Sequence, residues 1–294
     1  MTACTSCPRR CGVDRSVESG KLGVCGMGQE PVVARAALHH WEEPCISGKN
    51  GSGTVFFSGC SLRCVFCQNR EISHERKGKA ITVDRLREIY HELIAKGAHN
   101  INLVNPTHFT EAVAQSLDEP LPVPVVYNSG GYELASSLQK LQGKVQIYLP
   151  DLKYADNRLA ARYSGARDYV EHAVSAIEEM YRQTGDYVMG EDGLLKSGVV
   201  IRHLVLPANV KNTIAVIDMV KKMFPNGGVL FSLMGQYTPC GDLTSVPEVN
   251  RRITKREYEK AQDYLFESGI TDGFVQELSS AKEDYIPPFD FEGV

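Results

Sequence analysis

The chain has 294 residues and a net charge of −4, and its apolar and charged fractions are ordinary for a soluble globular protein. This length suits one large domain or two small ones, and the modest charge argues against a general nucleic-acid or membrane-surface binder. The first ten residues lack the apolar run of a signal peptide, and no apolar run approaches a membrane span. We therefore expect a cytoplasmic protein.

From residue 54 onward, segments typical of strands alternate with segments typical of helices. Residues 54–60 are β-branched and aromatic, and residues 82–97 carry apolar side chains at helical spacing between Thr82, a candidate N-cap, and Gly97. Further strand and helix pairs are predicted at 100–106 and 109–117, 123–130 and 132–143, 145–154 and 157–184, 198–209 and 213–224, and 228–237 and 254–269. This succession predicts a parallel α/β sheet, either open or closed into an incomplete barrel.

Polar side chains recur where the predicted strands end. In parallel α/β folds, ligands bind at the carboxyl ends of the strands. Each of these residues also has a simpler explanation in turn chemistry, but their recurrence on one rim predicts a shared site. The residues concerned are Cys60, Asn105, Thr107, Asn128, Ser129, Asp151, Lys153, Asn209, Gln236 and Tyr237, together with Arg202 and His203 within the fifth strand.

Most of the nine cysteines fall into two groups. The first contains Cys4, Cys7, Cys11 and Cys25, and the second contains Cys60, Cys64 and Cys67, while Cys45 and Cys240 stand alone. In a reducing cytosol, clustered thiols bind metal more often than they form disulfides. Both groups are therefore candidate metal sites.

The second group has the spacing C-x3-C-x2-C in the stretch "CSLRCVFCQN" (60–69). A fully ligated [4Fe–4S] cluster uses four thiolates, so three thiols predict one iron that is open to another ligand. S-adenosylmethionine has the amine and carboxylate to bind there. Electron transfer into its sulfonium would yield a 5′-deoxyadenosyl radical that abstracts hydrogen from a substrate.

The pattern C-x3-C-x-aromatic-C after a first strand resembles the radical S-adenosylmethionine superfamily. The chain is similar in particular to the pyruvate formate-lyase activating enzymes, through "FFSGCSLRCVFCQN" (56–69), "DLK" (151–153) and "IRHLVLP" (201–207). The resemblance covers about residues 45–270. It implies a partial six-unit (β/α) barrel of the TIM type at 46–270. From the residues outside this range, we expect a Cys-rich metal-binding segment at 1–45 and a tail packed on the barrel at 271–294.

The resemblance also implies roles for individual residues. Cys60, Cys64 and Cys67 would hold the [4Fe–4S] cluster, and Phe66 would lie by the adenine. Asp151, Lys153 and Arg202 would hold the ribose and methionyl groups of the cofactor. The other residues expected to bind S-adenosylmethionine are Asn105, Thr107, Asn128 and Ser129.

Three positions depart from the activating enzymes. Their Gly-Gly-Glu-Pro turn after strand two is replaced here by 104–108, and their Gly-Pro-Gly-x-Arg motif by 48–52, without the arginine. A histidine at the end of strand six is replaced around Gln236 and Tyr237. These differences weaken pyruvate formate-lyase as the substrate and leave the cluster prediction intact.

Three functions follow from these patterns. The first is a radical enzyme that cleaves S-adenosylmethionine and activates a glycyl radical enzyme. The second is a radical modifier of a peptide or small molecule, and the third is a non-catalytic iron–sulfur or zinc protein that transfers electrons or binds a partner. We expect a reductant such as flavodoxin or ferredoxin, and no nucleic-acid or membrane partner.

The N-terminal cysteines have the spacing C-x2-C-x3-C-x13-C, which predicts either Zn²⁺ or a second, fully ligated cluster. Such a closed site would be structural or would relay electrons. Nearby, residues 34–45 contain His39, His40, the only tryptophan and two acids. Either His39 or Glu42 faces the cavity, or the segment is an extra strand followed by a solvated acidic turn, which is the interpretation we favour.

Overall fold

The computed structural model describes residues 3–16, 22–278 and 287–294, and it is built around a parallel sheet. Its six central strands pair in parallel in the order of the chain. They are β2 (Ser52–Phe57), β4 (Ile101–Val104), β5 (Val125–Ser129), β6 (Ile147–Pro150), β8 (Leu195–Leu204) and β9 (Leu230–Met234). The α/β class and the partial (β/α) barrel predicted from the sequence are therefore confirmed.

Further strands extend the sheet at both ends. Strand β10 (Gly273–Val275) pairs in parallel with β9, whereas β1 (Val32–His39) pairs antiparallel with β2, and β3 (Lys79–Ala80) pairs with β1. The resulting order is β10-β9-β8-β6-β5-β4-β2-β1-β3, with the short β7 (Val188–Met189) paired to β8 outside this path. Within the described residues, β10 does not pair with β1 or β3, so the barrel is open along one flank.

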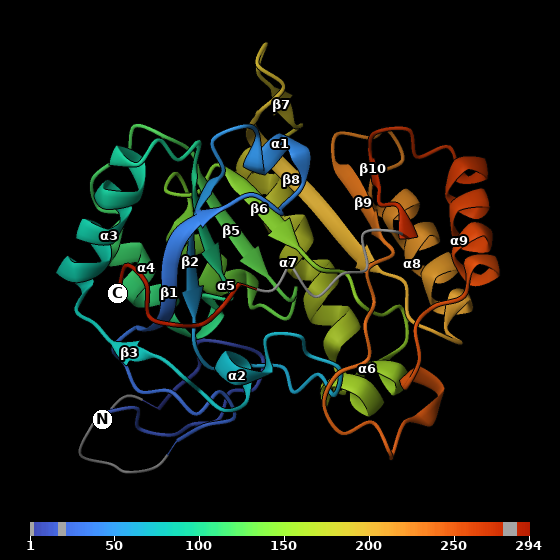
Figure 1. Ribbon diagram of the computed structural model, residues 1–294, viewed down its shortest axis with the longest axis horizontal. Coiled ribbons are helices and arrows are strands. Elements are labelled where there is room, and N and C mark those ends of the chain that lie inside the picture. The colour runs from blue at the N-terminus through green and yellow to red at the C-terminus, as the bar shows by residue number, and fades with distance from the viewer. Residues whose placement is uncertain (1–2, 17–21, 279–286) are drawn as a thin grey trace.

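The crossover helices flank the curved sheet (Figure 1). They are α3 (Val83–Ala95), α4 (Thr110–Ser116), α5 (Ala135–Leu138), α6 (Asn157–Ser164), α7 (Tyr169–Thr184), α8 (Val210–Met223) and α9 (Lys255–Ser268). Thr82 caps α3 by accepting a hydrogen bond from the Arg85 amide, as predicted. The helix predicted at 157–184 is two helices, because Gly165 adopts a φ of 63° and ends α6.

Two short helices mark the two ends of the barrel. Helix α2 (Arg70–Ser73) lies at the end toward which the parallel strands run, where the N-terminal segment also lies, and α1 (Pro44–Ser47) lies at the opposite end (Figure 1). The chain between β1 and α1 therefore approaches the barrel from the end away from α2. The last residues lie along β1, where the Ala36 amide donates to the Glu292 carbonyl and the Phe291 amide donates to the Ala34 carbonyl. Phe289 contacts Phe56 of β2, with ring centroids 5.6 Å apart.

No helix in the described part of the chain is both long and apolar enough to cross a bilayer.

Candidate active site

The three-cysteine loop leaves β2 through a tight turn. Gly59 has a φ of 79°, a conformation that L side chains rarely adopt, and it is followed directly by Cys60. The Leu62 amide donates to Cys60 Sγ at 3.4 Å, and Ser73 Oγ donates to Cys67 Sγ at 3.2 Å. Because these donors point at sulfur, they would stabilise thiolates bound to a metal.

Burial raises the pKa of all three thiols, and each lies within electrostatic range of another. Within the described residues, no three Cys, His, Asp or Glu side chains converge closely enough to hold a single metal ion. A [4Fe–4S] cluster binds each thiolate at a different iron, so its thiols must stand further apart than those around one ion. Three neighbouring thiols from one loop, with S-directed donors, fit such a cluster.

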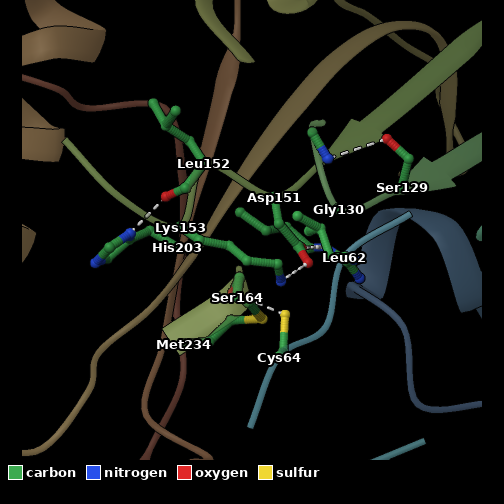
Figure 2. Close-up of polar contacts among 12 residues, drawn as sticks. Leu62, Cys64, Ser129, Gly130, Asp151, Leu152, Lys153, Ser164, His203 and Met234 are labelled. Atoms are coloured by element: carbon green, nitrogen blue, oxygen red, sulfur yellow. Dashed lines mark hydrogen bonds and ion pairs between the residues drawn. The ribbon is translucent and has the colours of Figure 1, made fainter. Parts of the chain in front are cut away.

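A buried charged group faces the cysteine loop from β6 and β8. Lys153 Nζ donates to Asp151 Oδ2 at 2.5 Å, and Arg202 Nε donates to Asp151 Oδ1 at 3.0 Å. Figure 2 shows the Lys153 side chain reaching toward Asp151 close to Cys64. Although burial opposes ionisation, the two cations lower the pKa of Asp151, and Asp151 raises that of Lys153. All three groups are therefore charged at neutral pH.

The side chains of Asp151 and Lys153 are only 17% and 19% exposed. These two residues therefore do not form an isolated surface ion pair. The two residues share one direction because they lie two positions apart where β6 ends at Pro150.

Glu42 extends this charged group deeper into the barrel. Its carboxylate accepts from Arg202 Nη1 at 3.1 Å, from Asn102 Nδ2 at 3.1 Å and from Asn128 Nδ2 at 3.2 Å. Burial raises the pKa of Glu42, while Arg202 opposes this shift. The solvated acidic turn that we favoured for this segment is wrong, because the turn after β1 is directed into the barrel, where Arg202 stabilises the acid.

A cavity of about 230 Å³ opens between the cysteine loop and this charged group. We call it the cofactor cavity. Phe66 lies on one side and packs against Tyr237, with ring centroids 5.6 Å apart. Its other lining residues are Cys64, Cys67, Gln68, Asn69, Asp151, Lys153, Arg202, Leu204, Met234, Gln236, Tyr237 and Thr238. It combines thiols, buried charges and an aromatic face.

Comparison with known families decides the assignment. Residues 54–239 match the family model of the Radical SAM superfamily, named for S-adenosylmethionine. The chain belongs to this superfamily. Membership implies that the chain binds a [4Fe–4S] cluster and S-adenosylmethionine, and it supports an enzymatic function. The match begins within β2 and ends just before Cys240, so it contains the three-cysteine loop and the charged group, but neither Glu42 nor the N-terminal cysteines.

One relative in sequence and several solved structures are also similar to this chain. "Uncharacterized protein MJ0674" of Methanocaldococcus jannaschii is 30% identical over 269 residues, which are 88% of this chain and 72% of that protein. Among solved structures, Streptococcus suis SuiB bound to S-adenosylmethionine is similar over 76% of this chain and 49% of SuiB, with 13% identity and a TM-score of 0.50. This chain thus spans about half the length of SuiB.

A variant of spore photoproduct lyase is similar over 79% of this chain and 78% of that protein, with 9% identity and a TM-score of 0.52. At such identities, the solved structures show a shared fold alone. The superfamily is shown by the family model, and none of these matches singles out the pyruvate formate-lyase activating enzymes.

The remaining predicted cofactor residues of this radical SAM protein fall into two sets. Asn105 and Asn128 contact parts of the site: Asn105 Nδ2 donates to the Gly59 carbonyl at 2.5 Å, and Asn128 Oδ1 accepts from Arg202 Nη2 at 2.6 Å. Neither residue lines the cofactor cavity. They position the cysteine loop and the guanidinium, respectively.

Thr107 and Ser129 lie on the other side of the barrel wall. Both hydroxyls face Glu133, a carboxylate that is 1% exposed. Burial raises the pKa of Glu133 to about 7, although hydrogen bonds from Thr107, Ser129 and Tyr127 oppose this rise. Ser129 therefore points away from its neighbour Asn128, as alternation along β5 requires.

The N-terminal cysteines of this radical SAM protein lie together. Cys7 is within electrostatic range of Cys11 and Cys25, and Cys25 is within range of Cys4. Backbone amides point at three of the sulfurs: those of Arg9, Val24 and Met27 donate to Cys7, Cys11 and Cys25.

This N-terminal segment also packs on the three-cysteine loop. Arg9 Nε donates to the Ser61 carbonyl at 2.7 Å. A Cβ placed on Gly59 would lie 2.8 Å from the Cys25 carbonyl oxygen and 2.4 Å from Met27 Cγ. The N-terminal segment and the three-cysteine loop thus contact each other at Gly59.

Sequence reasoning missed Glu133 and Cys240 and misjudged Glu42. Cys240 Sγ donates to the Phe66 carbonyl at 3.1 Å and lies within electrostatic range of Cys67. None of these three residues belongs to a spaced motif, so no local pattern distinguishes them. The nearest signal was the polar end of the sixth strand, where Gln236 and Tyr237 were noted and do line the cofactor cavity.

Proposed function

We propose that this chain is a radical enzyme that cleaves S-adenosylmethionine reductively and abstracts hydrogen from a substrate. The observation that carries this proposal is the three-cysteine loop opening onto a cavity with buried charges. When bound, the cluster and S-adenosylmethionine together supply an electron and a 5′-deoxyadenosyl radical. Cys60, Cys64 and Cys67 would hold the cluster.

The residues of the cofactor cavity match the chemical groups of S-adenosylmethionine. The ammonium of Lys153 suits a carboxylate, and the carboxylate of Asp151 suits ribose hydroxyls. Arg202 provides a fixed guanidinium, because Asp151, Glu42 and Asn128 hold three of its nitrogens. Phe66 presents an aromatic face for the adenine and, with Tyr237, excludes water from that side.

The test is anaerobic reconstitution with iron, sulfide, reductant and S-adenosylmethionine, followed by measurement of 5′-deoxyadenosine. Replacing Cys60, Cys64 and Cys67 together by Ala should abolish 5′-deoxyadenosine and lower bound iron. Cys45→Ala is the matched control, because this buried thiol lies outside both groups. Unchanged iron and 5′-deoxyadenosine in the triple variant would overturn the assignment of the cluster to these three cysteines. A reconstituted parent protein that forms no 5′-deoxyadenosine would overturn the radical enzyme and leave an electron-transfer or binding protein as the function.

For the substrate, we propose a small molecule or a single side chain of a peptide. A second cavity, of about 340 Å³, lies on the open flank of the barrel and shares Gln236 with the cofactor cavity. This size is within the roughly 300–1,000 Å³ of small-ligand sites. SuiB, which shares the fold, is known in complex with its precursor peptide SuiA.

Activation of a glycyl radical enzyme is the second candidate, and the resemblance of the cysteine loop favours it. A flexible glycine loop of a partner would have to enter the same flank. The two candidates differ in the product, since only the second leaves a stable radical on a partner protein. Electron paramagnetic resonance of a reaction with a candidate partner therefore distinguishes them.

We further propose that Cys4, Cys7, Cys11 and Cys25 bind Zn²⁺ or a second iron–sulfur cluster. The four thiols do not converge on a single ion in the described residues, so their spacing and the three amide donors carry this proposal. The packing of the segment on Gly59 and Ser61 supports either a clamp on the cysteine loop or a relay from a reductant such as flavodoxin or ferredoxin. Metal analysis of the triple variant tests this, because its remaining metal would belong to the N-terminal group. A triple variant that is folded but contains neither zinc nor iron would contradict metal binding by the N-terminal cysteines.

A further inference from the structure

The second cavity, which we call the flank cavity, lies where the barrel is open. It is lined by the turn after β1 and by the residues that follow β9 and β10, and its polar and aromatic lining side chains are His40, Trp41, Glu42, Ser47, Gln236 and Gln276. Gln236 lines the cofactor cavity as well. A ligand in the flank cavity would thus lie next to S-adenosylmethionine.

Carboxyl groups outnumber cationic groups behind this cavity, and burial raises the pKa of Glu42 and Glu43. Arg202 and Lys153 are the two cations, whereas Glu42, Glu43 and Asp151 are three carboxylic acids. Lys153 and Arg202 both bind Asp151, and Arg202 also binds Glu42. Glu43 is 6% exposed, and the cation that acts most strongly on it is the shared Arg202. Among the described residues, no Lys or Arg lines the flank cavity.

An unpaired hydrogen-bond acceptor faces the cavity as well. Within the described residues, the buried oxygen Gln276 Oε1 accepts no hydrogen bond, and Gln276 lines the cavity. Glu42 lines the same cavity, so a carboxyl group and an unpaired amide oxygen face one space. Buried acceptors without donors are unfavourable, and a ligand that brings donors removes the penalty.

We propose that the flank cavity binds a substrate group that is positively charged and rich in N–H donors, such as an ammonium or a guanidinium. This inference rests on the proposed function, since it names the substrate class of the same enzyme. Trp41 would lie along the bound group and can contact a cation through its indole face. Glu42 would be the acid that the cationic group meets, since it lines the cavity and Arg202 does not.

Trp41 is the only tryptophan of the chain, so its fluorescence reports directly on this cavity. The reconstituted protein with S-adenosylmethionine bound is titrated with agmatine, which carries an ammonium and a guanidinium, with neutral 1,5-pentanediol, and with anionic glutarate. We expect saturable binding of agmatine that is about tenfold or more tighter than that of the diol, and no binding of glutarate. Equal responses to all three would overturn the inference.

Charge changes at Gln276 sharpen the test. Gln276→Glu should tighten agmatine binding several-fold, and Gln276→Lys should weaken it about tenfold or more. Gln262→Glu and Gln262→Lys on α9 are matched controls, because Gln262 lines neither cavity. If Gln276→Lys does not fold, Gln276→Glu decides alone. Agmatine affinity that does not respond to the Gln276 substitutions would refute the assignment.

The two proposals fail separately. Parent protein that forms 5′-deoxyadenosine but shows no preference for agmatine refutes the cationic substrate and keeps the radical enzyme. Parent protein that binds agmatine but forms no 5′-deoxyadenosine under reduction refutes the radical enzyme and keeps the cation site.

Discussion

Replacing Asp151 by Asn should weaken S-adenosylmethionine binding through a defined loss of charge. The Asp151 carboxylate is the only acid that Lys153 contacts in the described residues, and it also holds Arg202 Nε. The side chain of Asn has nearly the same shape, and its oxygen can still accept from Arg202. Its amide group then faces Lys153, however, so the ammonium loses its partner.

The size of the effect on affinity follows from the hydrogen bond that the Asp151 carboxylate would no longer make to a ribose hydroxyl of S-adenosylmethionine. A hydrogen bond to a charged group contributes about 1.5–3 kcal/mol, which corresponds to roughly ten- to a hundred-fold in S-adenosylmethionine affinity. An exposed ion pair would contribute only about 0–1 kcal/mol, but Asp151 is 17% exposed and does not belong to that class. Breaking a buried pair also destabilises the fold, by up to about 3–5 kcal/mol. Glu42 keeps Arg202 paired in the variant, so we expect a loss of folding stability at the lower end of this range of about 3–5 kcal/mol.

Equilibrium dialysis of S-adenosylmethionine against reconstituted protein measures the affinity, and urea unfolding measures the stability. Asp156→Asn is the control, because Asp156 caps α6 at the surface, a position that Asn also caps well. An Asp151→Asn affinity within threefold of the parent would refute the cofactor role. An equal loss in Asp156→Asn would show that the effect is not specific to the cavity.

Two further predictions concern the surroundings of the cysteine loop. Gly59→Ala should reduce the iron retained after reconstitution, because the added Cβ would collide with Met27 and the Cys25 carbonyl and because a φ of 79° disfavours Ala. Gly143→Ala is the control, since Gly143 has a φ of 77° and its added Cβ would meet no atom within 4 Å. Equal iron retention in the two variants would contradict this prediction. Burial raises the pKa of Glu133 from an ordinary 4.5 to about 7, so the folded protein binds this proton more tightly than the unfolded chain, and stability should fall by up to about 3 kcal/mol as pH rises from 4.5 to 7. Glu133→Gln should remove that fall in urea unfolding at pH 5 and pH 8, and an unchanged pH dependence would show that Glu133 is not its source.

The sequence alone determined the features that depend on neighbours along the chain. The alternation of strands and helices follows from side-chain periodicity, which is local, and it led to the six parallel strands and the barrel. The three thiols of the cysteine loop lie within eight residues, Cys60 to Cys67, so one turn suffices to bring them together. Asp151 and Lys153 share a face because they are two positions apart on an extended chain.

Only the tertiary structure decided which polar groups are buried and what they contact. Glu42 looks like a surface acid in sequence, and it is buried because Arg202, 160 residues away, meets its carboxylate inside the barrel. Thr107 and Ser129 were assigned to the cofactor by their position at strand ends, yet they face Glu133 because of the side to which each side chain points. A buried charge is tolerated only where distant segments supply a counter-charge or donors, and residue spacing along the chain carries no record of that pairing.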